Sequence, residues 1–172
     1  MEANVGIQVL ISSHNCEEYL EDCFNSIEIA FNGYKWMMVF CDDASADNTE
    51  SVVNTYKTTT SADNIVYQKF EKASIVGKAK NRACLLSRAY KDDYPVICFM
   101  DSDDTMGAQR ISGLLPELSE DYPIVFGDFV EQQKNENVTQ THLKMEAETI
   151  NKNYRKDAPN WRPHFGCLFY RI

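Results

Sequence analysis

The chain has 172 residues, enough for one domain with a sizeable core but too few for two comfortable ones. Hydrophobic residues make up 44% and charged residues 25%, a globular composition that excludes wholesale disorder. The 17 basic and 26 acidic residues give a net charge of −9, which argues against a nucleic-acid or anionic-lipid partner. A phosphorylated ligand is still compatible with this charge, provided that a metal or local amides supply positive charge.

Strand-like and helix-like patterns alternate along the chain. Short apolar runs predict strands, and apolar residues that recur every three or four positions predict helices. In chain order, we expect a strand at 6–11, a helix at 19–31, a strand at 36–41, a short helix near 52–56, a strand at 65–70, a helix at 77–90, a strand at 96–100, a helix at 108–115, and strands at 124–126 and 165–170. This alternation predicts an α/β fold, with a mainly parallel central sheet and helices on both of its faces.

Two local features refine this picture. Asn15, followed three positions later by Glu18, predicts a capping box at the start of the first helix. Residues 131–160 are rich in Gln, Asn, Lys and Glu and show little periodicity, so we expect a variable loop region there. The chain is thus predicted to form a single domain over residues 1–172, either complete or as the N-terminal part of a longer protein.

The N-terminus and the cysteines favour a cytoplasmic location. Residues 1–4 lack a cationic targeting segment, and the apolar run at 36–41 is far shorter than the roughly 20 residues of a membrane span. The six cysteines form no CxxC pair and have no zinc-binding spacing. We therefore expect a reduced protein without a transmembrane segment.

Polar and acidic clusters follow three of the predicted strands. Residues 12–15 follow the first strand, Asp42 and Asp43 follow the second, and residues 101–104 follow the fourth. In an open α/β sheet, ligands bind beyond the carboxyl ends of the strands. The three clusters are therefore expected to form one ligand site.

The cluster at 101–104 is the strongest indication of chemistry. Asp101, Asp103 and Asp104 repel one another by roughly 3 kcal/mol per pair if they lie ~6 Å apart at an effective dielectric constant of ~20. A cation would relieve this repulsion, and oxygen ligands of this kind favour Mg²⁺ or Mn²⁺ completed by water and phosphate. The structural alternative is a solvated acidic turn that caps the helix beginning near Gly107.

The remaining clusters have alternative interpretations. Asp42 and Asp43 are suited to organising a turn, and equally to accepting a hydrogen bond from the imide N–H of uracil or the N1–H side of guanine. His14 either stacks on a base or is exposed without a role. The cations Lys78, Lys80 and Arg82 oppose the dipole at the start of their helix, which indicates either contact with an anion or a solvated cationic face.

Four ordered blocks resemble the family-2 glycosyltransferases of the GT-A fold. They comprise residues 9–15, 39–49, 77–83 and 99–104, and the resemblance extends over residues 7 to about 115. It implies a GT-A fold and divalent-cation-dependent sugar transfer. Compact domains of this kind look similar to those with which some large DNA viruses glycosylate their capsid proteins, which would place the chain in a host cytoplasm.

The resemblance also implies roles for individual residues. The positions that match nucleotide-sugar-binding residues of the family are Ser12 and His14 beside the nucleobase, Asp43 on uracil, Lys80 near the nucleotide, and Asp101 on the ribose or on a metal-bound water. Asp101 and Asp103 match the DXD motif and are the expected metal ligands, with Asp103 on the metal itself. The cofactor is expected to be Mn²⁺ or Mg²⁺.

The catalytic base is the main departure from the family pattern. In the family it usually lies in an acidic segment after the strand that corresponds to 165–170, whereas this sequence ends at Ile172. Asp128, Asp157 and His164 are the alternative candidates within the chain.

The expected reaction moves a sugar from a UDP-sugar to a hydroxyl of a glycan or glycoprotein acceptor, with inversion. The alternatives are a sugar-1-phosphate nucleotidyltransferase, a receiver-type module and a non-catalytic nucleotide-sugar-binding module. The nucleotidyltransferase would need a glycine-rich cationic loop after the first strand, where residues 12–15 read Ser-Ser-His-Asn.

Overall fold

A computed structural model describes residues 5–119, 124–126 and 168–171 of the chain. The strands are β1 (Ile7–Ser13), β2 (Trp36–Asp42), β3 (Ile65–Lys69), β4 (Val96–Asp101), β5 (Ile124–Phe126) and β6 (Leu168–Arg171). The α-helices are α1 (Glu17–Ala30), α2 (Thr49–Tyr56), α3 (Val76–Ser87) and α4 (Arg110–Leu114), and short 3₁₀ turns follow α3 at Arg88–Tyr90 and α4 at Leu115–Glu117.

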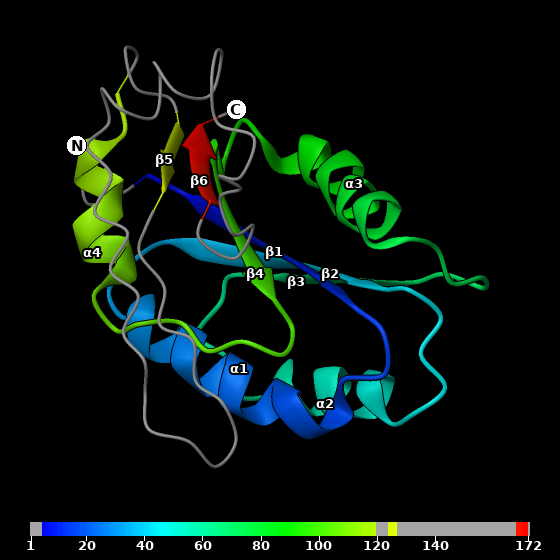
Figure 1. Cartoon of the computed structure of the whole chain (residues 1–172). Coiled ribbons are helices and arrows are strands. Elements are labelled where there is room, and N and C mark those ends of the chain that lie inside the picture. Colours follow the sequence, from blue (N-terminus) through cyan, green and yellow to red (C-terminus); the bar gives the residue numbers. More distant parts are fainter. Residues whose placement is uncertain (1–4, 120–123, 127–167, 172) are drawn as a thin grey trace, which may run out of the picture.

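The strands form one sheet with the order β3-β2-β1-β4-β6-β5 (Figure 1). Strands β1 to β4 are mutually parallel, whereas β6 runs antiparallel to both β4 and β5. Every residue of β2 is buried, as expected for a parallel strand that is covered on both faces. The predicted α/β architecture with a mainly parallel sheet is therefore confirmed.

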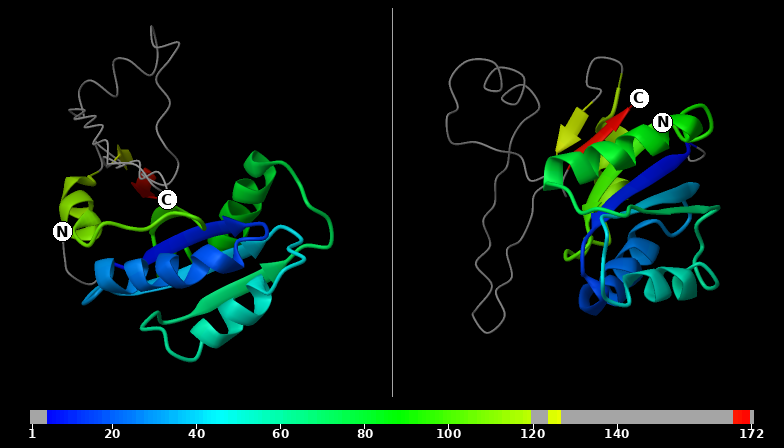
Figure 2. Two further views of the ribbon diagram at one scale, coloured as in Figure 1. Left: turned by 60° about the horizontal axis from the view of Figure 1, so that its bottom comes forward. Right: turned by 90° about the vertical axis from the view of Figure 1, so that its right-hand side faces the viewer.

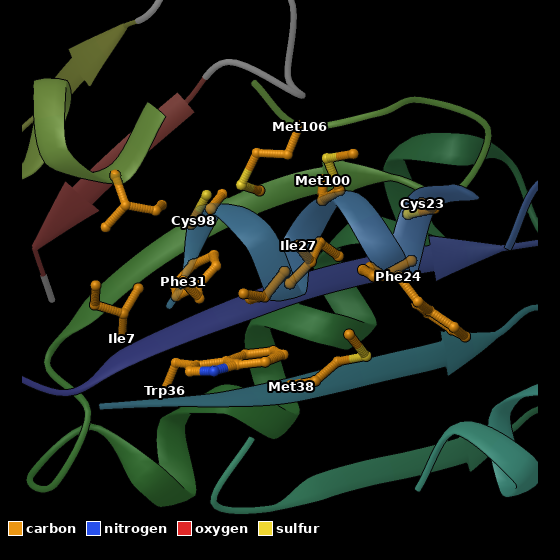
Figure 3. Packing of buried hydrophobic residues seen from close by; sticks show 14 of the residues in the cluster. Ile7, Cys23, Phe24, Ile27, Phe31, Trp36, Met38, Cys98, Met100 and Met106 are labelled. Carbon is orange, nitrogen blue, oxygen red and sulfur yellow. The ribbon is translucent and has the colours of Figure 1, made fainter. Parts of the chain in front are cut away.

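Helices cover both faces of the sheet (Figure 2). One face packs against α1, α2 and α4 through a cluster that includes Phe24, Ile27 and Val53. The opposite face is covered by α3, whose Ala83 packs against side chains of β1, β2 and β4. Figure 3 shows the first cluster, in which Phe31 lies 4.9 Å from Trp36 between ring centroids.

The start of α1 differs from the prediction. The residue that precedes the helix is Cys16, and no side-chain capping bond is made there, so the expected capping box of Asn15 and Glu18 is wrong. Asn15 instead adopts a left-handed conformation with φ of 53° and accepts a hydrogen bond from the Ala46 N–H at 2.7 Å. The amide of Glu17 donates to Asp47 at 3.0 Å, so a later loop caps this helix.

Some expectations about the remaining chain lie outside the described residues. These are the loop region at 131–160 and the first part of the strand expected at 165–170. The helix expected at 108–115 is shorter than predicted, with α4 ending at Leu114. In the part of the chain that the structure describes, no helix is long and apolar enough to cross a bilayer, and Cys16, Cys23 and Cys41 are free thiols.

Candidate functional site

The polar clusters meet at one edge of the sheet, as the sequence predicts. Because β1, β2 and β4 are parallel, Ser13 pairs with Asp42 and Ser12 pairs with Asp101 across neighbouring strands. In Figure 1 the segments that follow β1, β2 and β3 gather at the right of the view. Ser12 is half-buried here, and the buried hydroxyl of Ser13 has no hydrogen-bond partner among the described residues.

Asp42 has a structural role at this edge. Its side chain is fully buried, and it accepts hydrogen bonds of 2.7 Å from the Ser45 N–H and from the Tyr67 hydroxyl. Burial, reinforced by the hydrogen bond to Asp42, raises the pKa of Tyr67, which keeps this donor protonated. The turn-forming interpretation is therefore the right one for Asp42.

Asp43 lies beside Asp42 but is held by a different part of the chain. Its carboxylate accepts from the Ser74 N–H at 2.7 Å and from the Ser74 hydroxyl at 3.0 Å, and it forms an ion pair with Arg82. The guanidinium carbon of Arg82 lies 4.1 Å from the centroid of the Phe70 ring. Asp43 thus joins the end of β2 to the segment between β3 and α3.

His14 is exposed, and its ring is fixed against the β2 loop. Its Nδ1 lies 2.8 Å from the backbone carbonyl oxygen of Asp43, and its Nε2 lies 3.1 Å from the side-chain amide nitrogen, Nδ2, of Asn15. A carbonyl oxygen only accepts and an amide nitrogen only donates, so the neutral ring carries its proton on Nδ1. The imidazole is therefore oriented before any ligand arrives.

The two loops that follow β1 and β2 are also joined directly. The amide of Glu17 donates to Asp47, and the amide of Asn48 donates to the Glu17 carboxylate at 2.5 Å. The Asn15 N–H donates to the Ser45 hydroxyl at 2.9 Å. These reciprocal bonds fix the position of His14 relative to Asp43.

The second acidic cluster lies at the end of β4. Asp101 forms an ion pair with Lys80 of α3, while Asp103 is exposed to solvent. Lys80 therefore supplies one of the positive charges that the carboxylate cluster needs. The sequence predicted a divalent cation at this cluster and did not predict the pairing of Asp101 with Lys80.

The donor set at this position suits a hard divalent cation. Among the described residues, no three Asp, Glu, His or Cys side chains gather as a preformed metal cage. Mg²⁺ or Mn²⁺ bound beside a diphosphate needs only one or two carboxylates, because water and phosphate complete its coordination. Asp103, with Asp101 two residues before it, fits this requirement.

Sequence reasoning missed how the cations of α3 are used. It expected Lys80 and Arg82 to meet an anion or to face solvent, and the structure shows that their anions are Asp101 and Asp43 of this chain. It did not single out Ser74 or Phe70. The strand order could have indicated these residues. Strand β3 pairs in parallel with β2, so the segment that follows β3 starts beside Asp43 at the end of β2.

The candidate bases Asp128, Asp157 and His164 lie outside the described residues. A polar surface depression of about 670 Å³ lies beside α2 and contains none of the strand-end carboxylates; its lining residues are Asp47, Asn48, Glu50, Ser51, Asn54, Thr55, Thr58 and Lys69.

Comparison with known proteins identifies the family. The family model for glycosyl transferase family 2 matches residues 8–172. The chain belongs to glycosyl transferase family 2. This confirms the resemblance that the four sequence blocks carry.

Individual relatives agree with this membership. The chain is 29% identical over 114 residues to TuaG of Bacillus subtilis (strain 168), a glycosyltransferase assigned to teichuronic acid biosynthesis. That match covers 66% of this chain and 42% of TuaG, so the chain spans less than half of its relative.

Solved structures of S. aureus TarS share the fold. The TarS 1–349 structure in complex with UDP gives a TM-score of 0.66 at 20% identity, covering 97% of this chain and 47% of TarS 1–349. The complex of TarS 1–349 with UDP-GlcNAc gives 0.64 at 21% identity, covering 82% and 39%. The GT-A type of α/β fold is thereby established for this family-2 chain.

Proposed function

We propose that this chain binds a nucleotide-sugar, most simply a UDP-sugar, and transfers the sugar to a hydroxyl group of a glycan or glycoprotein. The observation that carries the proposal is the meeting of two groups at one sheet edge. One is Asp43 with His14, which suits a nucleobase, and the other is Asp101 with Asp103, which suits the diphosphate and its cation. The TarS structures with UDP and UDP-GlcNAc support the choice of a uridine nucleotide as donor.

The residues at this edge divide the work of donor binding. Ser12 and His14 would lie against the base, and Asp43 would accept a hydrogen bond from it. Asp101 would face the ribose, with Lys80 beside it near the phosphates. A divalent cation held by Asp103 would stabilise the negative charge that develops on the departing nucleotide.

The acceptor hydroxyl requires a base on the opposite side of the sugar. A carboxylate or imidazole there would remove the hydroxyl proton as the oxygen attacks the anomeric carbon, which inverts its configuration. Asp128, Asp157 and His164 remain the candidates in this sequence, together with residues of a longer chain. The assignment of the catalytic base therefore rests on the sequence alone.

Asp103→Asn tests the donor site. The change keeps the shape of the side chain and removes its charge, so we expect the variant to lose UDP-dependent Mn²⁺ binding and UDP release from a UDP-sugar. The wild type should gain about 2.7 kcal/mol of stability at a ligand concentration of 100 times Kd, seen as a rise in Tm. Calorimetric titration and thermal unfolding with a panel of UDP-sugars measure both effects.

Asp92→Asn is the matched control. Asp92 is exposed and precedes β4, so this variant has the same charge change at the other end of the strand. It should behave as the wild type does. Unchanged metal dependence in Asp103→Asn would contradict the metal assignment, and a wild type that binds no nucleotide would contradict the proposed function.

A further inference from the structure

We propose that Ser74 and Arg82 determine the nucleobase specificity of this site, by leaving Asp43 one acceptor position that selects uracil over guanine. The inference rests on the proposed function, because it takes Asp43 to face a nucleobase. It adds two residues of α3 and its preceding loop that were not assigned to donor recognition.

Other residues of the chain occupy most of the acceptor positions on Asp43. An ionised carboxylate has about four lone-pair sites on its two oxygens. The Ser74 N–H donates to Oδ2 at 2.7 Å, and Nη1 of Arg82 donates to Oδ1. The Ser74 hydroxyl lies 3.0 Å from Oδ1 and 3.1 Å from Oδ2, and its single proton serves one of them at a time. Three protein donors therefore leave about one site open.

The side chain and the backbone of Asp43 are both held in place by their neighbours. The Asp43 side chain is only 6% exposed, so little of its surface is accessible to a ligand. Its backbone is fixed on both sides, by donation from its N–H to the Ser13 carbonyl and acceptance at its own carbonyl from His14, each at 2.8 Å. Phe70 supports the flat face of the Arg82 guanidinium. The carboxylate cannot turn to offer both oxygens without breaking these contacts.

A single open acceptor on Asp43 matches the hydrogen-bonding edge of uracil better than that of guanine. The edge of uracil presents one N–H, at N3, between two carbonyl oxygens. The corresponding edge of guanine presents two adjacent donors, N1–H and the 2-amino group, which a carboxylate receives with both of its oxygens. A single open acceptor satisfies uracil and leaves one donor of guanine without a partner. An unpaired buried donor weakens binding by about 10- to 100-fold.

Nucleotide binding to the whole chain tests this inference. With Mn²⁺ present, the wild type should bind UDP at least about tenfold more tightly than GDP. Ser74→Ala and Arg82→Met each free an acceptor position, and Met keeps an apolar group on Phe70. In the double variant we expect the ratio of GDP Kd to UDP Kd to fall at least about tenfold towards unity.

Arg88→Met is the charge-matched control, because Arg88 is exposed in the 3₁₀ turn after α3. It should leave the ratio of the two Kd values unchanged. An equal fall in that ratio in Arg88→Met would overturn the inference, because net charge would then explain the effect. A double variant that keeps the wild-type ratio would overturn it as well.

A modified ligand tests the same point on the unaltered protein, so the inference stays testable if the double variant fails to fold. UDP methylated at N3 of uracil lacks the one proton that Asp43 would accept, and its Kd should rise at least about tenfold relative to UDP. Equal binding of the two ligands would overturn the inference. Equal wild-type affinity for UDP and GDP would overturn it while the proposed function stands, and absence of binding to any nucleotide diphosphate would overturn both.

Discussion

Lys80 is the residue whose position bears most directly on the proposed cation site. Its ammonium group pairs with Asp101, and both side chains are largely buried, at 14% and 23% exposure. A divalent cation that approaches this carboxylate has to share it with the ammonium group already present. Lys80 should therefore weaken cation binding in the absence of nucleotide.

Lys80→Met tests this competition. We expect the affinity for Mn²⁺ alone to rise several-fold, because two like charges close together at a partly buried site repel each other. Electron paramagnetic resonance of free Mn²⁺ measures the affinity directly and requires no turnover. Lys78→Met is the control, since Lys78 is an exposed cation on the same helix and its removal changes the net charge equally. The same Mn²⁺ affinity in both variants would show that Lys80 does not compete.

At the scale of elements, Asp47 joins the starts of two helices. Its Oδ2 accepts from the Glu17 N–H at 3.0 Å, and its Oδ1 accepts from the Thr49 N–H at 3.1 Å. These are the first residues of α1 and α2, whose N–H groups have no partner within their own helices. One carboxylate therefore serves as the cap of both.

Asp47→Ala should lower the free energy of unfolding by about 2 kcal/mol, because a lost cap costs about 1 kcal/mol. Asp47→Asn retains one acceptor oxygen and should lose about half as much. Urea unfolding at constant m-value measures both changes. Equal losses in the two variants would contradict a double cap.

The same side chain gives a pH dependence. Burial raises the pKa of Asp47, but the hydrogen bonds from Glu17 and Thr49 outweigh it and hold this pKa below its ordinary value of 3.8. A lowered folded-state pKa contributes stability above the unfolded-state value and loses it as the pH falls through the folded-state value. The stability difference between wild type and Asp47→Asn should therefore shrink as the pH falls below 3.8.

At the scale of the whole molecule, the two faces of the sheet carry two hydrophobic clusters that are built from alternating residues of the same strands β1, β2 and β4. Phe24 of α1 is 2% exposed, stacks on Tyr56 at 4.1 Å and lies edge-on to Phe40 at 6.1 Å. It thus connects α1 and α2 to the interior strand β2. In the labelled cluster of Figure 3, Phe24 lies between α1 and the strands.

Phe24→Ala should cost about 3–5 kcal/mol, a large share of the about 5–15 kcal/mol that stabilises a domain. We expect near-ultraviolet and far-ultraviolet circular dichroism to report a single transition shifted to lower denaturant. Leu85→Ala is the control, because Leu85 is 60% exposed on α3 and should change stability by less than about 0.5 kcal/mol. A separate early transition for α1 and α2 would contradict this coupling of the two clusters through shared strands.

The family and the course of β1 to β4 follow from the sequence. Apolar periodicity is a local property, and a fully apolar run such as 36–41 is typical of a parallel strand buried on both faces. The rule that ligands bind beyond parallel strand ends then places Asp43 and Asp101 at one edge. The sequence alone thus predicted that these carboxylates share one edge of the sheet.

The partners of these carboxylates required the tertiary structure. Ser74 and Arg82 lie 31 and 39 positions from Asp43 in the chain, and Asp47 caps a helix that begins 30 positions earlier. The antiparallel β6 beside β4 also has no local signature. Hydrogen-bond satisfaction between distant segments depends on loop conformation and on strand order, and neither is encoded in the periodicity of a single segment. For this reason the sequence determined which chemical groups reach the sheet edge, and only the fold decided which residues of the chain occupy their acceptor positions.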